Sequence, residues 1–374
     1  MSLTGTPFFL TSLALVILAV VLPLALWGRI PGPPLIRGAA RLTMLLFAQI
    51  TAITVVFVLV NNANNLYDTW GDLLGTDSHV QAAQDLGPDG MGGRQIKNEP
   101  RQLQRFRPAE DPRMGSGVRM TDLTGRISGV SGEVYVWLPP QYDDPAYRNK
   151  KFPVVELLPG YPGSAKAWFG SLNVGEQLRP MMQRGEIKPF ILVAPRTNIL
   201  TGADTGCVNL PGKANADSWL TVDVRKMVID NFRAGSAPDS WSLAGYSAGA
   251  HCAAKLALSH PDRYRAAVAM SGYNDPALEP DSLAGKDPVR RVASNPLHIL
   301  KAANTAGRPP RTALYVSGAP GDGYQTGLAL RQFAQRPTTV TVRPIAADAG
   351  GHTTPVWRNQ VPEIFRWLGG QVRA

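Results

Sequence analysis

The sequence predicts an α/β fold, with a mostly parallel central sheet covered by helices on both faces, preceded by a hairpin of two transmembrane helices. Three observations support this fold class. Two long uncharged segments lie near the N-terminus, short apolar runs alternate with helix-favouring stretches in residues 118–374, and a glycine-flanked serine lies at one junction between such segments. The 374 residues are enough for one large catalytic domain and additional segments.

The first apolar segment covers residues 7–27 and the second covers residues 42–60. Neither carries a charged residue, and each is long enough to cross a hydrocarbon core of about 30 Å as a helix. A cleaved signal peptide is the alternative for the first segment, but its apolar stretch is long and no basic segment precedes it. We therefore expect a transmembrane hairpin within residues 1–62.

The connector between the two segments carries Arg29, Arg37 and Arg41, whereas residues 1–6 carry no charge and the chain after Val60 is acidic. Cytoplasmic loops are enriched in lysine and arginine, so this asymmetry places the connector in the cytoplasm. Both termini, and with them the catalytic domain, are then expected on the outer side of the cell membrane.

The overall charge bears on possible partners. The chain has 38 Lys and Arg against 28 Asp and Glu, a net charge of +10. No basic run interleaved with aromatic residues and no nucleic-acid motif occurs, so nucleic acid is not an expected partner. The positive charge instead favours an anionic membrane or cell-envelope polymer.

The two cysteines, Cys207 and Cys252, are candidates for a disulfide, because an extracytoplasmic domain lies where disulfides form and persist. Two free buried thiols are the alternative. Residues 63–117 show no lasting period of 2 or 3.6, so we expect a linker there and a catalytic domain comprising residues 118–374.

In the expected catalytic domain, short apolar segments typical of strands alternate with segments that favour helices. The predicted strands are residues 132–139, 152–159, 190–195, 240–245, 266–272, 312–318 and 339–345, and the predicted helices are residues 216–233, 248–264, 324–336 and 356–370. Such alternation predicts a mostly parallel sheet. In such sheets the catalytic residues lie at the carboxyl ends of the strands.

Ser247 is the candidate nucleophile, within the sequence Gly245-Tyr246-Ser247-Ala248-Gly249. The motif directly follows a predicted strand and directly precedes a predicted helix, as expected of a serine on a sharp strand-to-helix turn. Such a turn packs tightly and needs small neighbours, which the motif supplies. A buried serine in a glycine-rich turn is the alternative, but it explains neither the preceding strand nor the partners that follow.

His352 is the candidate base and Asp322 the favoured acid. A serine hydroxyl needs a base, usually a histidine held by a carboxylate. In α/β enzymes whose serine lies on such a strand-to-helix turn, the chain order is serine, acid, histidine. His352 lies between the last predicted strand and the last predicted helix, and Asp322 lies one strand-helix unit earlier. Asp275 and Asp348 are the alternative acids.

Acyl transfer also needs two backbone N–H groups directed at the developing oxyanion. Ala248, the residue after the nucleophile, is expected to supply one, and Tyr161, in the loop after the predicted strand 152–159, the other. This chemistry implies no metal and no organic cofactor.

The sequence resembles the esterase D group of α/β hydrolases, which includes S-formylglutathione hydrolase and the mycolyltransferases of the antigen 85 complex. The resemblance covers residues 118–370 and rests on residues 128–142, 157–163, 217–224, 244–253, 270–276, 317–322 and 350–368. It implies the α/β-hydrolase fold, an ester or acyl-lipid substrate, and an acyl-enzyme on Ser247 with Asp322 and His352 as its partners.

We therefore expect a membrane-anchored, extracytoplasmic serine esterase. A mycolyltransferase-like acyltransferase is the first alternative, because it would use the same residues and differ only in passing the acyl group to a hydroxyl of an envelope glycan or lipid. A non-catalytic envelope-binding protein that retains the fold is the second alternative.

Overall fold

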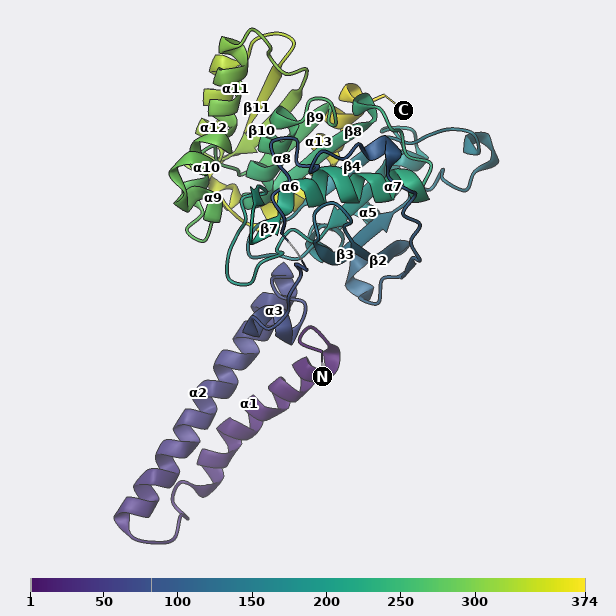
Figure 1. The fold of residues 1–374 in the computed structure, drawn as a ribbon. Coiled ribbons are helices and arrows are strands. Elements are labelled where there is room, and N and C mark those ends of the chain that lie inside the picture. Colours follow the sequence, from purple (N-terminus) through teal and green to yellow (C-terminus); the bar gives the residue numbers. More distant parts are fainter. Residues whose placement is uncertain (1, 82, 374) are drawn as a thin grey trace. The chain divides into compact units, whose positions relative to one another are not determined.

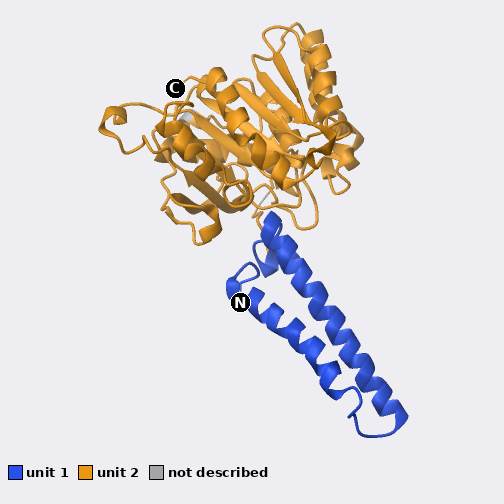
Figure 2. Ribbon diagram, turned by 180° about the vertical axis from the view of Figure 1, so that it is seen from behind, with its two compact units in different colours: residues 1–76 blue, residues 77–374 orange. Residues whose placement is uncertain are grey.

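A computed structural model describes residues 2–81 and 83–373 of the chain. The chain forms two compact units, residues 1–76 and residues 77–374 (Figure 2). The boundary between them falls inside the segment that the sequence predicts to be a linker.

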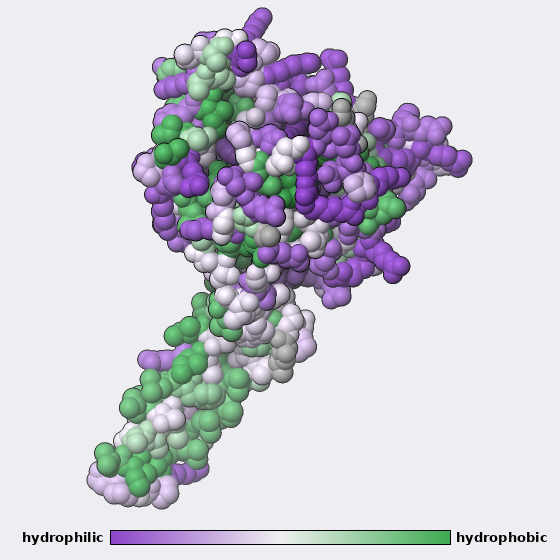
Figure 3. Space-filling view, viewed as in Figure 1, coloured by the Kyte–Doolittle hydropathy of each residue, from purple (hydrophilic) through white to green (hydrophobic). Residues whose placement is uncertain are grey.

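The first unit is a helical hairpin. Helix α1 (Thr6–Leu26) packs against helix α2 (Pro34–Asn64), and the short helix α3 (Trp70–Leu74) follows. Apolar side chains cover most of the surface of α1 and α2 (Figure 3). Both helices are long and apolar enough to cross a membrane, although a signal sequence near the N-terminus has the same properties. Because α2 begins before the predicted span, Arg37 and Arg41 lie on the helix itself rather than in a loop.

The second unit is built on a nine-stranded sheet with the order β1-β2-β3-β5-β4-β8-β9-β10-β11 (Figure 1). The strands are β1 (Arg107–Pro108), β2 (Val118–Thr124), β3 (Ser131–Trp137), β4 (Val154–Leu158), β5 (Ile191–Pro195), β8 (Trp241–Tyr246), β9 (Ala266–Met270), β10 (Ala313–Gly318) and β11 (Thr339–Pro344). The strands β5, β4, β8, β9, β10 and β11 pair parallel to their neighbours in this order. The pairs β1–β2, β2–β3 and β3–β5 are antiparallel. The mostly parallel sheet is confirmed. A small antiparallel pair, β6 (Asn209–Leu210) and β7 (Ala214–Asn215), lies outside it.

Helices cover both faces of the sheet, as the alternation of strands and helices predicts. One face packs against α7 (Arg225–Asn231), α8 (Ala248–Ser259), α11 (Pro296–Thr305) and α12 (Tyr324–Phe333), and the other against α4 (Lys166–Phe169), α5 (Val174–Gln183) and α13 (Thr354–Gln371). The remaining helices are α6 (Ala216–Ser218), a π-helical segment (Trp219–Val224), α9 (Leu283–Lys286) and α10 (Pro288–Ala293). Short 3₁₀ turns lie at Ile96–Asn98, Pro112–Met114, Pro145–Tyr147, Pro238–Ser240, Pro276–Leu278 and Ala347–Ala349.

The burial of the strands follows their place in the sheet. Strands β4, β5, β8 and β9 are buried along their whole length because both faces of the sheet are covered, and they are largely apolar apart from Glu156 in β4 and Ser242 in β8. Strand β2 instead alternates between buried and exposed positions and carries Arg119 and Asp122. This weaker apolar signal explains why the sequence did not predict β2 as a strand.

Residues 83–117, within the predicted linker, belong to the second unit and are bonded to the rest of it. The backbone amide of Gln102 donates to the carboxylate of Asp230 and that of Gln104 to the side chain of Asn231, both at 2.8 Å. Such bonds from the backbone to polar side chains leave no hydrophobic period in the sequence, so pattern reasoning does not detect them.

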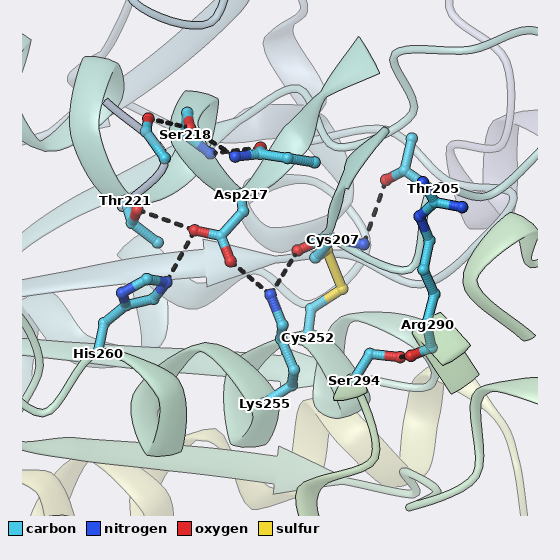
Figure 4. A network of polar contacts seen from close by, with 12 residues as sticks. Thr205, Cys207, Asp217, Ser218, Thr221, Cys252, Lys255, His260, Arg290 and Ser294 are labelled. Atoms are coloured by element: carbon cyan, nitrogen blue, oxygen red, sulfur yellow. Dashed lines mark hydrogen bonds and ion pairs between the residues drawn. A yellow bond between two sulfur atoms is a disulfide. The ribbon is translucent and has the colours of Figure 1, made fainter. Parts of the chain in front are cut away.

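A disulfide joins Cys207 to Cys252 on α8 (Figure 4). One turn further along α8, Lys255 donates to the carbonyl oxygen of Cys207 at 2.9 Å and pairs with the carboxylate of Asp217. Burial raises the pKa of Asp217, but Lys255 and His260 outweigh burial and hold that pKa well below its usual range. The disulfide and this ionised carboxylate together fasten the loop after β5 to α8.

Candidate active site

Ser247 lies on the turn between β8 and α8, with φ 56° and ψ −126°. Residues other than glycine rarely adopt this conformation, and it persists only where the surrounding structure fixes it. Here the amide of Ser247 donates to the carbonyl oxygen of Met270 at 3.0 Å. The flanking glycines are needed for space: a Cβ on Gly249 would lie 2.2 Å from the carbonyl oxygen of Leu158, and one on Gly245 would lie 2.0 Å from that of Gly249.

A continuous hydrogen-bonded chain leads from Ser247 through His352 to Asp322. The Nε2 atom of His352 lies 2.8 Å from the Oγ atom of Ser247, and its Nδ1 atom lies 2.7 Å from Oδ1 of Asp322. An ionised carboxylate can only accept, so Nδ1 carries the hydrogen and Nε2 presents the lone pair that accepts the serine hydroxyl. This tautomer allows His352 to take the serine proton.

The carboxyl group of Asp322 is held in its ionised form. Burial raises its pKa, but hydrogen bonds from His352 and from the hydroxyl of Ser271 lower it by more, so the pKa lies below its usual value. Ser271 in turn accepts a hydrogen bond of 3.0 Å from the indole N–H of Trp357. The ring of Trp357 also lies edge-on to His352, with 4.9 Å between centroids, and stacks on Tyr246.

Sequence reasoning missed Ser271 and Trp357. Both lie inside segments that carry the resemblance, one just after β9 and the other in the first turn of α13. They contact the candidate acid and the candidate base. A residue pattern does not reveal this, since a serine and a tryptophan in these places fit a purely structural role equally well.

The two alternative acids lie elsewhere. Asp275 forms an ion pair with Arg291, whose Nε atom lies 2.7 Å from its carboxylate. Asp348 is exposed, and no hydrogen bond or ion pair joins its side chain to another residue in the described part of the chain. Of the three candidate acids, Asp322 is the one that bonds to His352.

The two expected oxyanion donors lie next to the nucleophile. Ala248 is the first residue of α8, and the N–H groups in the first turn of a helix have no acceptor within that helix. Tyr161 follows Gly160 in the loop after β4, and a Cβ on Gly160 would lie 3.1 Å from the Cβ atom of Ser247. The loop that carries Tyr161 therefore passes directly beside Ser247.

An acidic side chain that the sequence did not single out also lies near His352. Burial holds the pKa of Glu279 above its usual value, and the charge of His352 opposes this shift only in part. Glu279 belongs to the segment after β9, and that segment is tied to the loop carrying the disulfide, because the amide of Leu283 donates to the carbonyl oxygen of Asp204 at 2.8 Å. The segment after β9 is thus fastened to the loop that carries Cys207.

Comparison with known proteins agrees with the architecture. A family model described as "Putative esterase" matches residues 128–368. A protein of Corynebacterium glutamicum that is described as uncharacterized is 26% identical over 251 residues, which cover 63% of this chain and 56% of that protein. The chain therefore spans little more than half the length of this relative.

Several solved structures share the fold. A ferulic acid esterase superposes with a TM-score of 0.56 at 18% identity, covering 68% of this chain and 97% of the esterase. An S-formylglutathione hydrolase of Agrobacterium tumefaciens gives 0.54 at 16% identity, covering 73% and 100%. A fluorophosphonate-binding serine hydrolase of Staphylococcus aureus gives 0.54 at 16% identity, covering 67% and 97%. The predicted α/β-hydrolase fold is confirmed.

Proposed function

The chain belongs to this esterase family, and we propose that it is a membrane-anchored serine esterase that cleaves carboxylic esters through an acyl-enzyme on Ser247. The observation that supports the proposal most strongly is the hydrogen-bonded chain from Asp322 through His352 to Ser247. The distance from Asp322 Oδ1 to His352 Nδ1 is 2.7 Å, and that from His352 Nε2 to Ser247 Oγ is 2.8 Å. A serine in a strained turn, a neutral imidazole and an ionised carboxylate have the roles of nucleophile, base and orienting acid.

In the first half of the reaction, the Oγ atom of Ser247 attacks the carbonyl carbon of the ester while His352 Nε2 takes the hydroxyl proton. Asp322 keeps the Nδ1–H bond and stabilises the imidazolium that forms. The N–H groups of Tyr161 and Ala248 donate to the oxyanion. When the tetrahedral intermediate collapses, the C–O bond breaks, the departing alcohol takes the proton from Nε2, and the acyl group stays on Ser247.

In the second half, a water molecule attacks the acyl-enzyme, gives a proton to His352 Nε2, and releases the acid while Ser247 recovers its hydroxyl proton. The His352 side chain is 47% exposed, so water can reach this position. Transfer to an envelope hydroxyl uses the same atoms, with the acceptor alcohol in place of water.

The location is part of the proposal. In this proposal helices α1 and α2 anchor the chain in the cell membrane. Arg29, Arg37 and Arg41, at the end of the hairpin where α1 meets α2, favour a cytoplasmic position for that end. The catalytic unit then lies on the outer side, a setting that suits the disulfide between Cys207 and Cys252.

The test is ester hydrolysis by the purified full-length chain in detergent, with p-nitrophenyl esters of increasing acyl length as substrates. Ser247→Ala should abolish turnover, and Ser259→Ala, an exposed serine at the other end of the same helix, should not change it. Full activity of Ser247→Ala would refute the proposal. Addition of a glycan or lipid alcohol that yields a new ester faster than free acid would instead identify an acyltransferase.

A further inference from the structure

The middle of α2 contains one polar side chain whose hydrogen-bonding groups are left unused. The hydroxyls of Thr43, Thr51 and Thr54 each donate to the carbonyl oxygen four residues earlier, at 2.8 to 3.0 Å. Gln49 lies among them and is exposed, and its amide forms no hydrogen bond with any residue in the ranges 2–81 and 83–373. Its donor and acceptor groups therefore require a partner from outside the chain.

This amide lies deep in the span. Gln49 is seven residues from Leu42 (49 − 42) and eleven from Val60 (60 − 49), the ends of the uncharged segment. At about 1.5 Å per residue these separations are about 10 Å and 16 Å. A glutamine side chain is too short to reach either interface, and an amide left unpaired in hydrocarbon costs several kcal/mol.

The amide also points away from α1. At 100° per residue, Gln49 lies on the side of α2 opposite to Thr51 and Val58, which are buried in the hairpin. On the same side, exposed residues follow one another at alternating spacings of three and four. They are Leu42, Leu45, Gln49, Ala52, Val56 and Leu59. This is the spacing of the a and d positions of a coiled coil, with a single polar residue at one of them.

We propose that this face of α2, here called the Gln49 seam, pairs with the same face of a second copy of the chain in the membrane. All copies insert with the same orientation, so their α2 helices are parallel and their Gln49 side chains lie at the same depth. The amide is self-complementary, since its NH₂ group donates and its oxygen accepts, and two copies around a two-fold axis satisfy each other. A single polar a position specifies register and oligomeric state in paired helices, and glutamine bonds across transmembrane helices.

The inference rests on the membrane anchor of the proposed function, but not on catalysis. Figure 3 shows that apolar side chains cover most of the visible surface of the hairpin. The other residues of the seam are apolar, so lipid tails suit them as well as a protein surface does. Apolar side chains alone would therefore give no reason to pair. The free-energy cost of leaving the Gln49 amide without a hydrogen-bonding partner in hydrocarbon supplies that reason.

Cysteine cross-linking of the full chain in native membranes tests the pairing. Both natural cysteines are in the disulfide, and none is free in the described part of the chain, so a single cysteine introduced into α2 reports on its own position. Val56→Cys lies on the seam. Ile50→Cys, also exposed and 100° around the helix from Gln49, is the matched control. Under mild oxidation Val56→Cys should give a disulfide-linked homodimer and Ile50→Cys should not.

Substitution of the amide completes the test. In the Val56→Cys background, Gln49→Leu should weaken self-association about tenfold, and Gln49→Asn should retain it, while hydrolysis of p-nitrophenyl esters stays unchanged in both. Equal cross-linking at Val56 and Ile50, or an unchanged dimer with Gln49→Leu, overturns the pairing. So does mass spectrometry that identifies a different protein in the cross-linked product. If carbonate releases the chain from the membrane, the anchor itself fails, and the pairing fails with it.

Discussion

Replacing Asp322 by asparagine should lower kcat by about a thousandfold. The carboxylate acts on the imidazolium that His352 becomes when it takes the serine proton, across a hydrogen bond of 2.7 Å. Two opposite charges centred about 4 Å apart interact by about 4 kcal/mol at an effective dielectric constant of about 20. Asparagine keeps the shape but removes the charge, and 4 kcal/mol of lost transition-state stabilisation is about 10³ in rate.

The assay is steady-state hydrolysis of a p-nitrophenyl ester, with Asp275→Asn as the matched control. Asp275 is paired with Arg291 and not with His352, so its substitution should change kcat less than threefold. KM should change little in Asp322→Asn, because the carboxylate does not contact substrate. Equal rates for Asp322→Asn and the wild type, or a larger loss in Asp275→Asn, would refute the assignment of the acid.

Three further predictions concern stability and packing. Burial raises the pKa of Glu156 to about 8; because the folded chain then retains a proton that the unfolded chain releases, stability falls as pH rises from about 5 to about 7.5. In urea titrations, Glu156→Gln should reduce the loss of unfolding free energy over this pH range by about 3 kcal/mol. If the variant loses as much unfolding free energy over this range as the wild type, this reasoning is wrong. Gly249→Ala, whose Cβ would lie 2.2 Å from a carbonyl oxygen of β4, should lower the free energy of unfolding by about 3 kcal/mol and abolish ester hydrolysis. Gly369→Ala, with open space around it, should be tolerated, and equal effects would argue against tight packing at the turn. Cys252→Ala should cost about 4 kcal/mol, because the bond to Cys207 closes a loop of 45 residues; a wild-type melting temperature would contradict this.

Local chemistry made part of the site predictable. The turn around Ser247 requires small residues at several of five consecutive positions, so it can be recognised as a short sequence motif. His352 and Asp322 are distant in the chain, but the order of strands and helices fixes which loops meet at one edge of the sheet. In the structure His352 lies within hydrogen-bonding distance of both Ser247 and Asp322.

Other features depend on contacts that no pattern encodes. Ser271 and Trp357 contact Asp322 and His352, and their residue types suit many buried positions. Strand β2 is covered on one face only, so its apolar positions are sparse. Residues 83–117 are held to the rest of the second unit by hydrogen bonds from backbone amides to polar side chains. Such bonds produce no periodic pattern of apolar residues in the sequence. The candidate catalytic residues could be predicted from the sequence, whereas these supporting contacts could not.

The most direct test of the central claim is peptide mapping after the purified chain has reacted with a fluorophosphonate. We expect a single modified residue, Ser247, and loss of the label in Ser247→Ala and in a chain denatured before the reaction. Labelling at another serine, or no labelling of a chain that hydrolyses esters, would contradict an acyl-enzyme on Ser247.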